Sequence, residues 1–198
     1  MTILVAGATG KTGLHLVQDL LDRGHKPTAL VRESSDTSAL PEGVDTRHGD
    51  LTDLRNGVCD GMQVVVFAAG SGGSTGPDMT DKVDRDGAKR LIDLAHDAGV
   101  ARFVMLSSVG ADQPDAAGDI AHYLKAKHDA DEHLKASGLT YAILRPVALT
   151  DDARGTDVIL GAAVDKSATA ARADVAYVLA EAAVTGRHDG KSQDMQSA

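Results

Sequence analysis

Short apolar runs alternate with longer amphipathic segments along most of the chain. Consecutive aliphatic positions of this kind are typical of strands buried on both faces. The runs are Ile3–Ala6, Thr28–Val31, Val44–His48, Val64–Ala69, Phe103–Leu106 and Tyr141–Leu144. The segments with helical spacing of apolar residues are Thr12–Arg23, Asp81–Ala98 and Ile120–Ser137. This alternation predicts one α/β domain over residues 1–198, with a doubly wound parallel sheet covered by helices on both faces.

Other segments have a weaker pattern. Gly70–Pro77 is rich in glycine and serine and predicts a flexible loop after the fourth strand. Residues 147–171 lack a clear period and predict a small lobe after the sixth strand. Arg172–Val184 predicts a final helix, and Gly186–Ala198 predicts a polar, frayed tail.

Composition and charge narrow the classes of function. The 198 residues include 29 acidic and 20 basic side chains, for a net charge of −9. This balance disfavours binding to nucleic acid, which needs a basic surface. No window approaches the ~18 apolar residues of a membrane span, and no basic leader precedes the first run. The single cysteine, Cys59, excludes an internal disulfide, so we expect a cytoplasmic protein that acts on a small molecule.

The first apolar run leads directly into a glycine-rich turn and then a helical segment. Gly7, Gly10 and Gly13 have GxxGxxG spacing, a variant of the dinucleotide-binding fingerprint, in its strand–turn–helix context. The first glycine allows a tight turn, the second lets the backbone approach a pyrophosphate, and the third lets helix and strand pack closely. The free amides of the helix start then face the phosphates. The turn predicts a cofactor site that also includes Thr9, Lys11 and Thr12.

A nucleoside triphosphate site is an alternative for the same residues. Gly10-Lys11-Thr12 resembles the end of a Walker A loop, whose lysine and hydroxyl serve phosphates and magnesium. That loop needs a glycine five positions before Gly10, where this chain has Val5. The dinucleotide interpretation is therefore favoured, with a purely structural turn as a second alternative.

The end of the second predicted strand bears on the choice of cofactor. A carboxylate at its last position would bind the adenine ribose, but Arg32 follows Val31 instead. The guanidinium can pair bidentately with a 2′-phosphate, and the hydroxyls of Ser34 and Ser35 can add hydrogen bonds. A solvated surface arginine is the alternative, and Glu33 leaves room for NAD. The pattern favours NADP over NAD.

The third and fourth predicted strands end in further candidate cofactor contacts. Asp50-Leu51 follows the third strand and Ala68-Ala69-Gly70 the fourth, at the carboxyl edge where such sheets bind ligands. Asp50 is predicted either to accept a hydrogen bond from the adenine amino group or to cap a helix that begins near Asp53.

Residues able to perform acid–base chemistry follow the fifth strand. That strand ends in Ser107-Ser108, and Tyr123 and Lys127 lie further on with i, i+4 spacing, on one face of a helix. An ammonium near the phenol lowers the pKa of tyrosine and makes it a usable proton donor. A serine hydroxyl could orient a substrate carbonyl. The alternative is that Tyr123 is an ordinary half-buried helix residue.

Together these motifs resemble the short-chain dehydrogenase/reductase superfamily, in its atypical NAD(P)H-binding branch. This branch contains NmrA-like regulators and reductases of the flavin and biliverdin-IXβ type. The resemblance rests on Gly7–Gly13, Arg32, Asp50-Leu51, Ser107-Ser108, Tyr123 with Lys127, and Leu144-Arg145-Pro146. It implies a Rossmann fold with the nicotinamide near Ser108, Tyr123, Lys127 and Pro146, and Lys127 on its ribose. It also implies a monomer, or a homodimer formed through the helices of Asp81–Ala98 and Ile120–Ser137.

The leading hypothesis is an NADP-dependent oxidoreductase that reduces a small carbonyl, quinone or flavin-like acceptor. Tyr123 would donate the proton, Lys127 would tune it, and Ser108, with Ser107 beside it, would orient the acceptor. A non-catalytic, NmrA-like NADP(H) sensor is the alternative, since it needs only the glycine turn. A nucleotide-sugar epimerase or dehydratase is a third hypothesis, weakened by the short segment after Arg145. No metal site is predicted, because His122, His128 and His133 do not share a helix face.

Overall fold

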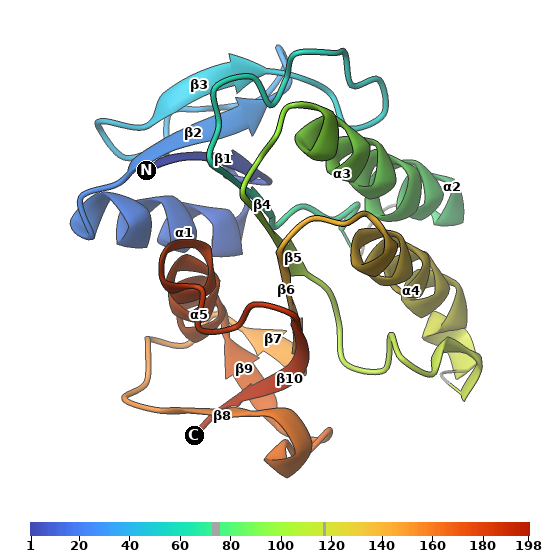
Figure 1. Cartoon of the computed structure of the whole chain (residues 1–198). Helices are drawn as coiled ribbons and strands as arrows, with labels where there is room; N and C mark the ends of the chain where they lie inside the picture. The colour runs from blue at the N-terminus through green and yellow to red at the C-terminus, as the bar shows by residue number, and fades with distance from the viewer. Residues whose placement is uncertain (73–75, 117) are drawn as a thin grey trace.

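The computed structural model describes residues 1–72, 76–116 and 118–198. Over these residues the chain forms a twisted eight-stranded sheet between two layers of helices (Figure 1). Its strand order is β3-β2-β1-β4-β5-β6-β10-β8, and neighbours run parallel except for the antiparallel pair β10 and β8. The strands are β1 (Thr2–Ala6), β2 (Lys26–Val31), β3 (Asp45–His48), β4 (Val64–Phe67), β5 (Arg102–Leu106), β6 (Tyr141–Pro146), β8 (Val158–Leu160) and β10 (Lys191–Ser197). The predicted doubly wound α/β fold is confirmed.

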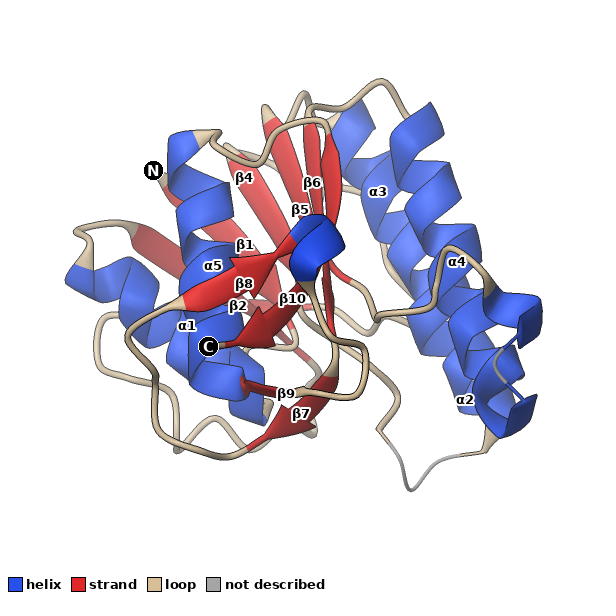
Figure 2. Ribbon diagram, turned by 90° about the horizontal axis from the view of Figure 1, so that it is seen from below, coloured by secondary structure: helices blue, strands red, loops and turns tan. Residues whose placement is uncertain are grey.

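Helices cover both faces of the sheet (Figure 2). One face carries α1 (Lys11–Asp22) and α5 (Arg172–Thr185), which pack against each other. The other face carries α2 (Pro77–Thr80), the π-helical segment η1 (Asp81–Gly87), α3 (Ala88–Asp97) and α4 (Ala121–Ala136). Single 3₁₀ turns are η2 (Pro114–Ala116), η3 (Gly118–Ile120) and η4 (Gly161–Ala163). A small parallel pair, β7 (Ala148–Thr150) and β9 (Thr169–Ala171), lies beside the main sheet. None of the described helices is long and apolar enough to span a bilayer.

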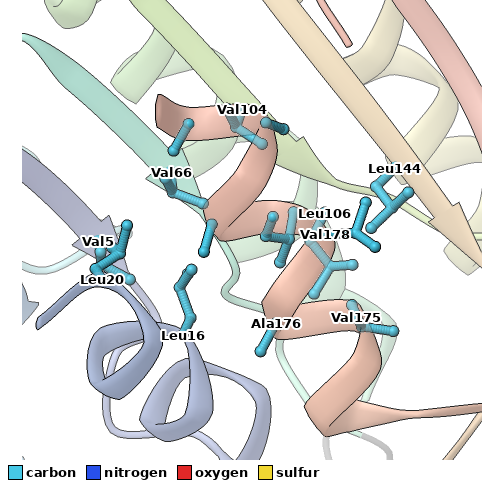
Figure 3. Packing of buried hydrophobic residues seen from close by; sticks show 14 of the residues in the cluster. Val5, Leu16, Leu20, Val66, Val104, Leu106, Leu144, Val175, Ala176 and Val178 are labelled. Carbon is cyan, nitrogen blue, oxygen red and sulfur yellow. The ribbon is translucent and has the colours of Figure 1, made fainter. Parts of the chain in front are cut away.

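The continuous apolar runs arise because alternate residues of each strand are buried on opposite faces. In β1, Val5 packs with Leu16 and Leu20 of α1, and Val178 of α5 belongs to the same cluster (Figure 3). Leu4 points to the other face, where it joins the cluster of α3 and α4. Burial of each such side chain contributes about 1.5–3 kcal/mol. The two clusters hold β1, β4 and β5 between the helix layers, and the carboxyl ends of these strands form one edge of the sheet.

Three sequence predictions differ from the structure. Residues 191–197 are not a frayed tail but strand β10, which pairs with β6 and β8 through its backbone and buries Met195. The predicted lobe at 147–171 forms separate short strands, and β8 joins the main sheet. The helix expected near Asp53 is absent: residues 50–61, all described, form turns and an isolated bridge. The predicted loop at 70–77 lies partly outside the described residues, and its Pro77 starts α2.

Candidate functional site

The glycine turn between β1 and α1 has the close contacts that its spacing predicts. Gly7 has a φ of +85°, and a Cβ there would lie 2.6 Å from the Ala69 amide nitrogen. A Cβ on Gly13 would lie 2.0 Å from the Gly7 carbonyl oxygen, far inside van der Waals contact. Gly10 is exposed at the start of α1, and no described side chain caps that end. The turn therefore presents bare backbone and the free amides of α1 to solvent, which suits a phosphate group.

A cavity of about 720 Å³ begins at this turn and follows the carboxyl ends of β1, β2 and β4. We call it the Arg32 cavity. Its lining brings together most of the residues predicted to bind the cofactor: Gly7, Thr9, Gly10, Arg32, Ser35, Asp50, Leu51, Ala68, Ala69 and Gly70. Ser34 lines a neighbouring cavity of about 610 Å³, which also includes Arg32 and Arg55.

Two charged residues of the Arg32 cavity, Arg32 and Asp50, differ in their hydrogen bonds. Arg32 is exposed, and its backbone amide donates to Ser35 Oγ (3.1 Å). Asp50 Oδ1 accepts from both the amide and the hydroxyl of Thr52, each at 2.8 Å. These hydrogen bonds, with the Arg32 charge nearby, lower the pKa of Asp50. Asp50 therefore stabilises a turn instead of capping a helix, and it presents a charged carboxylate to the cavity.

A second cavity, of about 730 Å³, adjoins the first through Gly10, Ala68, Ala69, Gly70 and Ser71, which line both. We call it the Tyr123 cavity. Its lining includes Lys11, Thr12, Ser107, Tyr123 and Lys127 among the predicted site residues. Ser108 and Pro146 are not part of it, and Gly13 is buried beneath the turn. Most of the predicted cofactor and catalytic residues thus line one cleft along the sheet edge, and Ser107 rather than Ser108 lines the same cavity as Tyr123.

Lys127 is almost fully buried under the Tyr123 cavity. Its Nζ lies 2.9 Å from Asp84 Oδ1, 5.8 Å from the centre of the Tyr123 ring and 5.7 Å from that of Phe67. Burial alone would lower the pKa of Lys127, but Tyr123 and the Asp84 carboxylate outweigh it, and the pKa is raised. Lys127 is therefore a fixed positive charge on the phenol side of the cleft, already paired with an anion.

Asp84 is a residue of this site that the sequence pattern did not reveal. The acidic stretch around Asp81–Asp86 predicts a helix start with solvated carboxylates, yet Asp84 has no exposed surface. It lies in η1, and its Oδ2 accepts from the Ser71 amide (2.9 Å) while Oδ1 pairs with Lys127. Asp84 thus connects the loop shared by both cavities to helix α4. Its partners, Ser71 and Lys127, are distant in sequence, so no local spacing identifies Asp84 as a residue of the site.

A second buried charge pair supports Ser107. The Ser107 hydroxyl donates to Asp131 Oδ2 (2.9 Å), which also accepts from Arg145 Nε (3.0 Å) and Nη2 (2.9 Å). Burial raises the pKa of Asp131, although Arg145 and Ser107 favour its charged form. In this structure the Ser107 hydroxyl therefore donates its hydrogen bond to Asp131. Ser108 makes one long contact, from its hydroxyl to the Val109 carbonyl oxygen (3.4 Å).

Nothing in the described residues gathers three or more histidine, cysteine or acidic side chains around a possible metal position. The cleft combines a glycine turn with the uncapped start of α1, exposed cations and a half-buried phenol. The family model for NAD(P)H-binding proteins matches residues 7–185. The chain belongs to this NAD(P)H-binding family. The resemblance to the atypical branch of the short-chain dehydrogenases/reductases is thereby confirmed.

Individual relatives cover nearly the whole chain. An uncharacterized sugar epimerase, YhfK, from Bacillus subtilis is 36% identical over 182 residues, which is 89% of this chain and 85% of the relative. A structure from Bacillus halodurans, provisionally assigned as an NAD-dependent epimerase/dehydratase, has a TM-score of 0.94 at 35% identity and covers 100% of this chain and 94% of its own. The oxidoreductase ylbE from Lactococcus lactis has a TM-score of 0.87 at 28% identity, covering 100% and 91%. The NAD(P)H-binding Rossmann fold thus extends over the full chain.

Proposed function

We propose that this NAD(P)H-binding protein is an NADP(H)-dependent reductase of small carbonyl, quinone or flavin-like acceptors. The observation that carries the proposal is the junction of the two cavities at Gly10 and Ala68–Gly70. A dinucleotide that enters along the glycine turn would end beside Tyr123 and Lys127. The name of the Lactococcus lactis oxidoreductase is in keeping with this chemistry.

The residues of the Arg32 cavity fit the cofactor. Gly7 and Gly10 would hold the pyrophosphate, since a side chain at Gly7 would fill the space beside Ala69. The Asp50 carboxylate would accept a hydrogen bond from the adenine amino group. Arg32, with Ser34 and Ser35, would bind a 2′-phosphate. Arg47 and Arg55 line the same outer cavity as Arg32, but so do Glu33, Asp50 and Asp53, so the proposed preference for NADP over NAD rests on Arg32 with its serines.

NADPH, when bound, would supply a hydride, and a carbonyl acceptor would then need one proton from the protein. Tyr123 is the group for this, because its ring lines the cavity and Lys127 lies on its buried side. The Lys127 charge stabilises the phenolate left after proton transfer, and Asp84 keeps that ammonium in place. Ser107 would position the end of β5 through the hydrogen bond that its hydroxyl donates to Asp131.

A non-catalytic NADP(H) sensor is a second candidate, and one observation favours it. Lys127 and Ser107 are both engaged in buried contacts, with Asp84 and Asp131, so each has a structural role without any substrate. A nucleotide-sugar substrate has less support, despite the name of YhfK, because the segment between β6 and α5 forms only three short strands and one 3₁₀ turn. A cytoplasmic setting is part of the proposal, since Cys59 is buried and unpaired.

The experiment that tests the proposal has two steps. Calorimetric titration with NADPH, NADP⁺, NADH and NAD⁺ separately establishes the preferred cofactor. Loss of NADPH absorbance is then followed with an aldehyde, a quinone and a flavin as acceptors. The reductase hypothesis expects turnover with at least one acceptor. Tight binding with a strong preference for one redox state, and no turnover with any acceptor, would favour the sensor.

A further inference from the structure

One side of the Tyr123 cavity carries positive charge that the proposed proton transfer does not use. Lys11 and Arg172, the first residues of α1 and α5, both line this cavity. Both also pair with Asp151, which follows β7: the Lys11 ammonium contacts Oδ2, and Arg172 Nη1 lies 2.5 Å from Oδ1. Two cations therefore share a single carboxylate at the cavity wall, and the group has a net charge of +1.

Two further carboxylates, Asp152 and Asp174, lie close in sequence to this group, and neutral donors bind each of them. Asp152 Oδ2 accepts from the Thr150 hydroxyl (2.7 Å). Asp174, in the first turn of α5, is buried and accepts from the Gly155 amide (2.9 Å) and the Ser197 hydroxyl (2.5 Å). Two helix starts add their partial positive charge at the same place. The side chains of Lys11 and Asp151 are 68% and 55% exposed, so their contact is weak and Asp151 can exchange for another anion at low cost, although Arg172 is only 24% exposed.

Large apolar side chains also lie on the cavity rim, together with polar ones. Two large hydrophobic side chains of the rim are exposed, Ile120 of η3 (56%) and Leu149 of β7 (37%), and both line the cavity. Over the described residues, Met1 is the only further exposed large hydrophobic residue. Leu106 and Pro77 continue the apolar lining, while Asp119 and His122 lie on the α4 side. An exposed apolar rim beside a cationic wall suits a ligand with an apolar body and one anionic group.

We propose that Lys11 and Arg172 bind a carboxylate or phosphate of the acceptor in exchange for Asp151, while Ile120 and Leu149 cover its apolar body. This inference rests on the proposed reductase function and deepens it, since it names the substrate class as an anionic amphipathic acceptor. The pyrophosphate of the cofactor has the same chemistry as such an anion, and Lys11 belongs to the glycine turn. Arg172 lies outside the glycine turn, so its substitution distinguishes an anion of the acceptor from the pyrophosphate of the cofactor.

Riboflavin and FMN are a matched pair of probes, because FMN differs only by its phosphate. Equilibrium dialysis of each against the protein, with and without saturating NADP⁺, gives the ratio of their affinities without any turnover. The variants are Arg172→Gln and Asp151→Asn. Arg187→Gln is the control, because it removes an arginine that pairs with Glu181 and lines none of the three cavities. NADPH affinity is measured for every variant.

The proposal expects wild-type protein to prefer FMN over riboflavin. Arg172→Gln should reduce that preference about three- to tenfold, Asp151→Asn should increase it, and Arg187→Gln should leave it unchanged. No preference for FMN in the wild type, or a preference that Arg172→Gln does not change, overturns the proposal. A loss of NADPH affinity in Arg172→Gln without a change in the flavin ratio overturns it too, and assigns Arg172 to the cofactor. Flavin preference without NADPH oxidation would support this site and reject the reductase.

Discussion

The ion pair of Asp84 and Lys127 provides the sharpest test of the site's internal structure. Asp84 has no exposed surface, the Lys127 side chain is 4% exposed, and their charged atoms lie 2.9 Å apart. The substitution Asp84→Asn keeps the shape of the side chain and an oxygen that can accept from the Ser71 amide. It removes the negative charge, so the Lys127 ammonium is left buried without its anion.

The expected loss of stability in Asp84→Asn depends on whether Lys127 keeps or loses its proton. Removal of one partner of a buried ion pair typically costs about 3–5 kcal/mol. Lys127 can escape by losing its proton, which costs about 4.6 kcal/mol at pH 7 and about 1.9 kcal/mol at pH 9 from an ordinary pKa near 10.4. In the wild type the pKa of Lys127 is raised, so the ion pair contributes fully below about pH 10.4 and is lost only as pH rises through the higher folded value. We therefore expect a destabilisation of about 3–5 kcal/mol at pH 7 that falls to about 2 kcal/mol at pH 9.

Urea unfolding at both pH values measures this difference. Circular dichroism and tyrosine fluorescence are suitable probes, since the chain has no tryptophan. The double variant Asp84→Asn/Lys127→Met should be more stable than Asp84→Asn by about 2 kcal/mol or more, because no charge is left buried. Asp86→Asn is the matched control in the same π-helical segment, where an exposed pair with Arg85 predicts a change of about 0.5 kcal/mol or less. A destabilisation by Asp84→Asn that is below 1 kcal/mol, or independent of pH, would refute the reasoning.

Three further predictions concern the cleft. Gly13→Ala places a Cβ 2.0 Å from the Gly7 carbonyl, so α1 must shift; calorimetry should show NADPH affinity reduced about tenfold or more, with Gln18→Ala unchanged. Tyr123→Phe should lower turnover of a carbonyl acceptor about 10²-fold with little change in NADPH affinity; equal turnover would remove Tyr123 from the mechanism. Arg32→Gln should weaken NADPH binding about tenfold and leave NADH binding unchanged; an equal loss for both would argue against a 2′-phosphate site.

The core of the fold could be predicted because it depends on local pattern. Strands such as β1 and β4 are apolar on consecutive residues, and Gly7 and Gly13 have a spacing that is typical of a tight strand–turn–helix junction. Strand β10 could not be predicted in this way. Its sequence, Lys191–Ser197, is polar apart from Met195, and its place in the sheet comes from backbone pairing with β6 and β8. Backbone hydrogen bonds leave no mark on the hydrophobic pattern.

The candidate site also combines residues that local sequence spacing predicts with residues that only the tertiary structure reveals. The glycine turn and the Tyr123/Lys127 pair are visible in the sequence because their spacing is local. Asp84 and Asp131 look like ordinary charges on helix surfaces, and only tertiary structure shows that Lys127 and Arg145 are buried against them. A buried acid requires a partner, but sequence alone does not say which acids are buried.

The most direct test of the central claim, that the glycine turn binds the diphosphate of a pyridine nucleotide, is a calorimetric titration of the purified protein with NADPH and NADH. We expect saturable binding of one nucleotide per chain, with NADPH preferred. Absence of binding to either nucleotide, reduced or oxidised, at millimolar concentration would contradict the account.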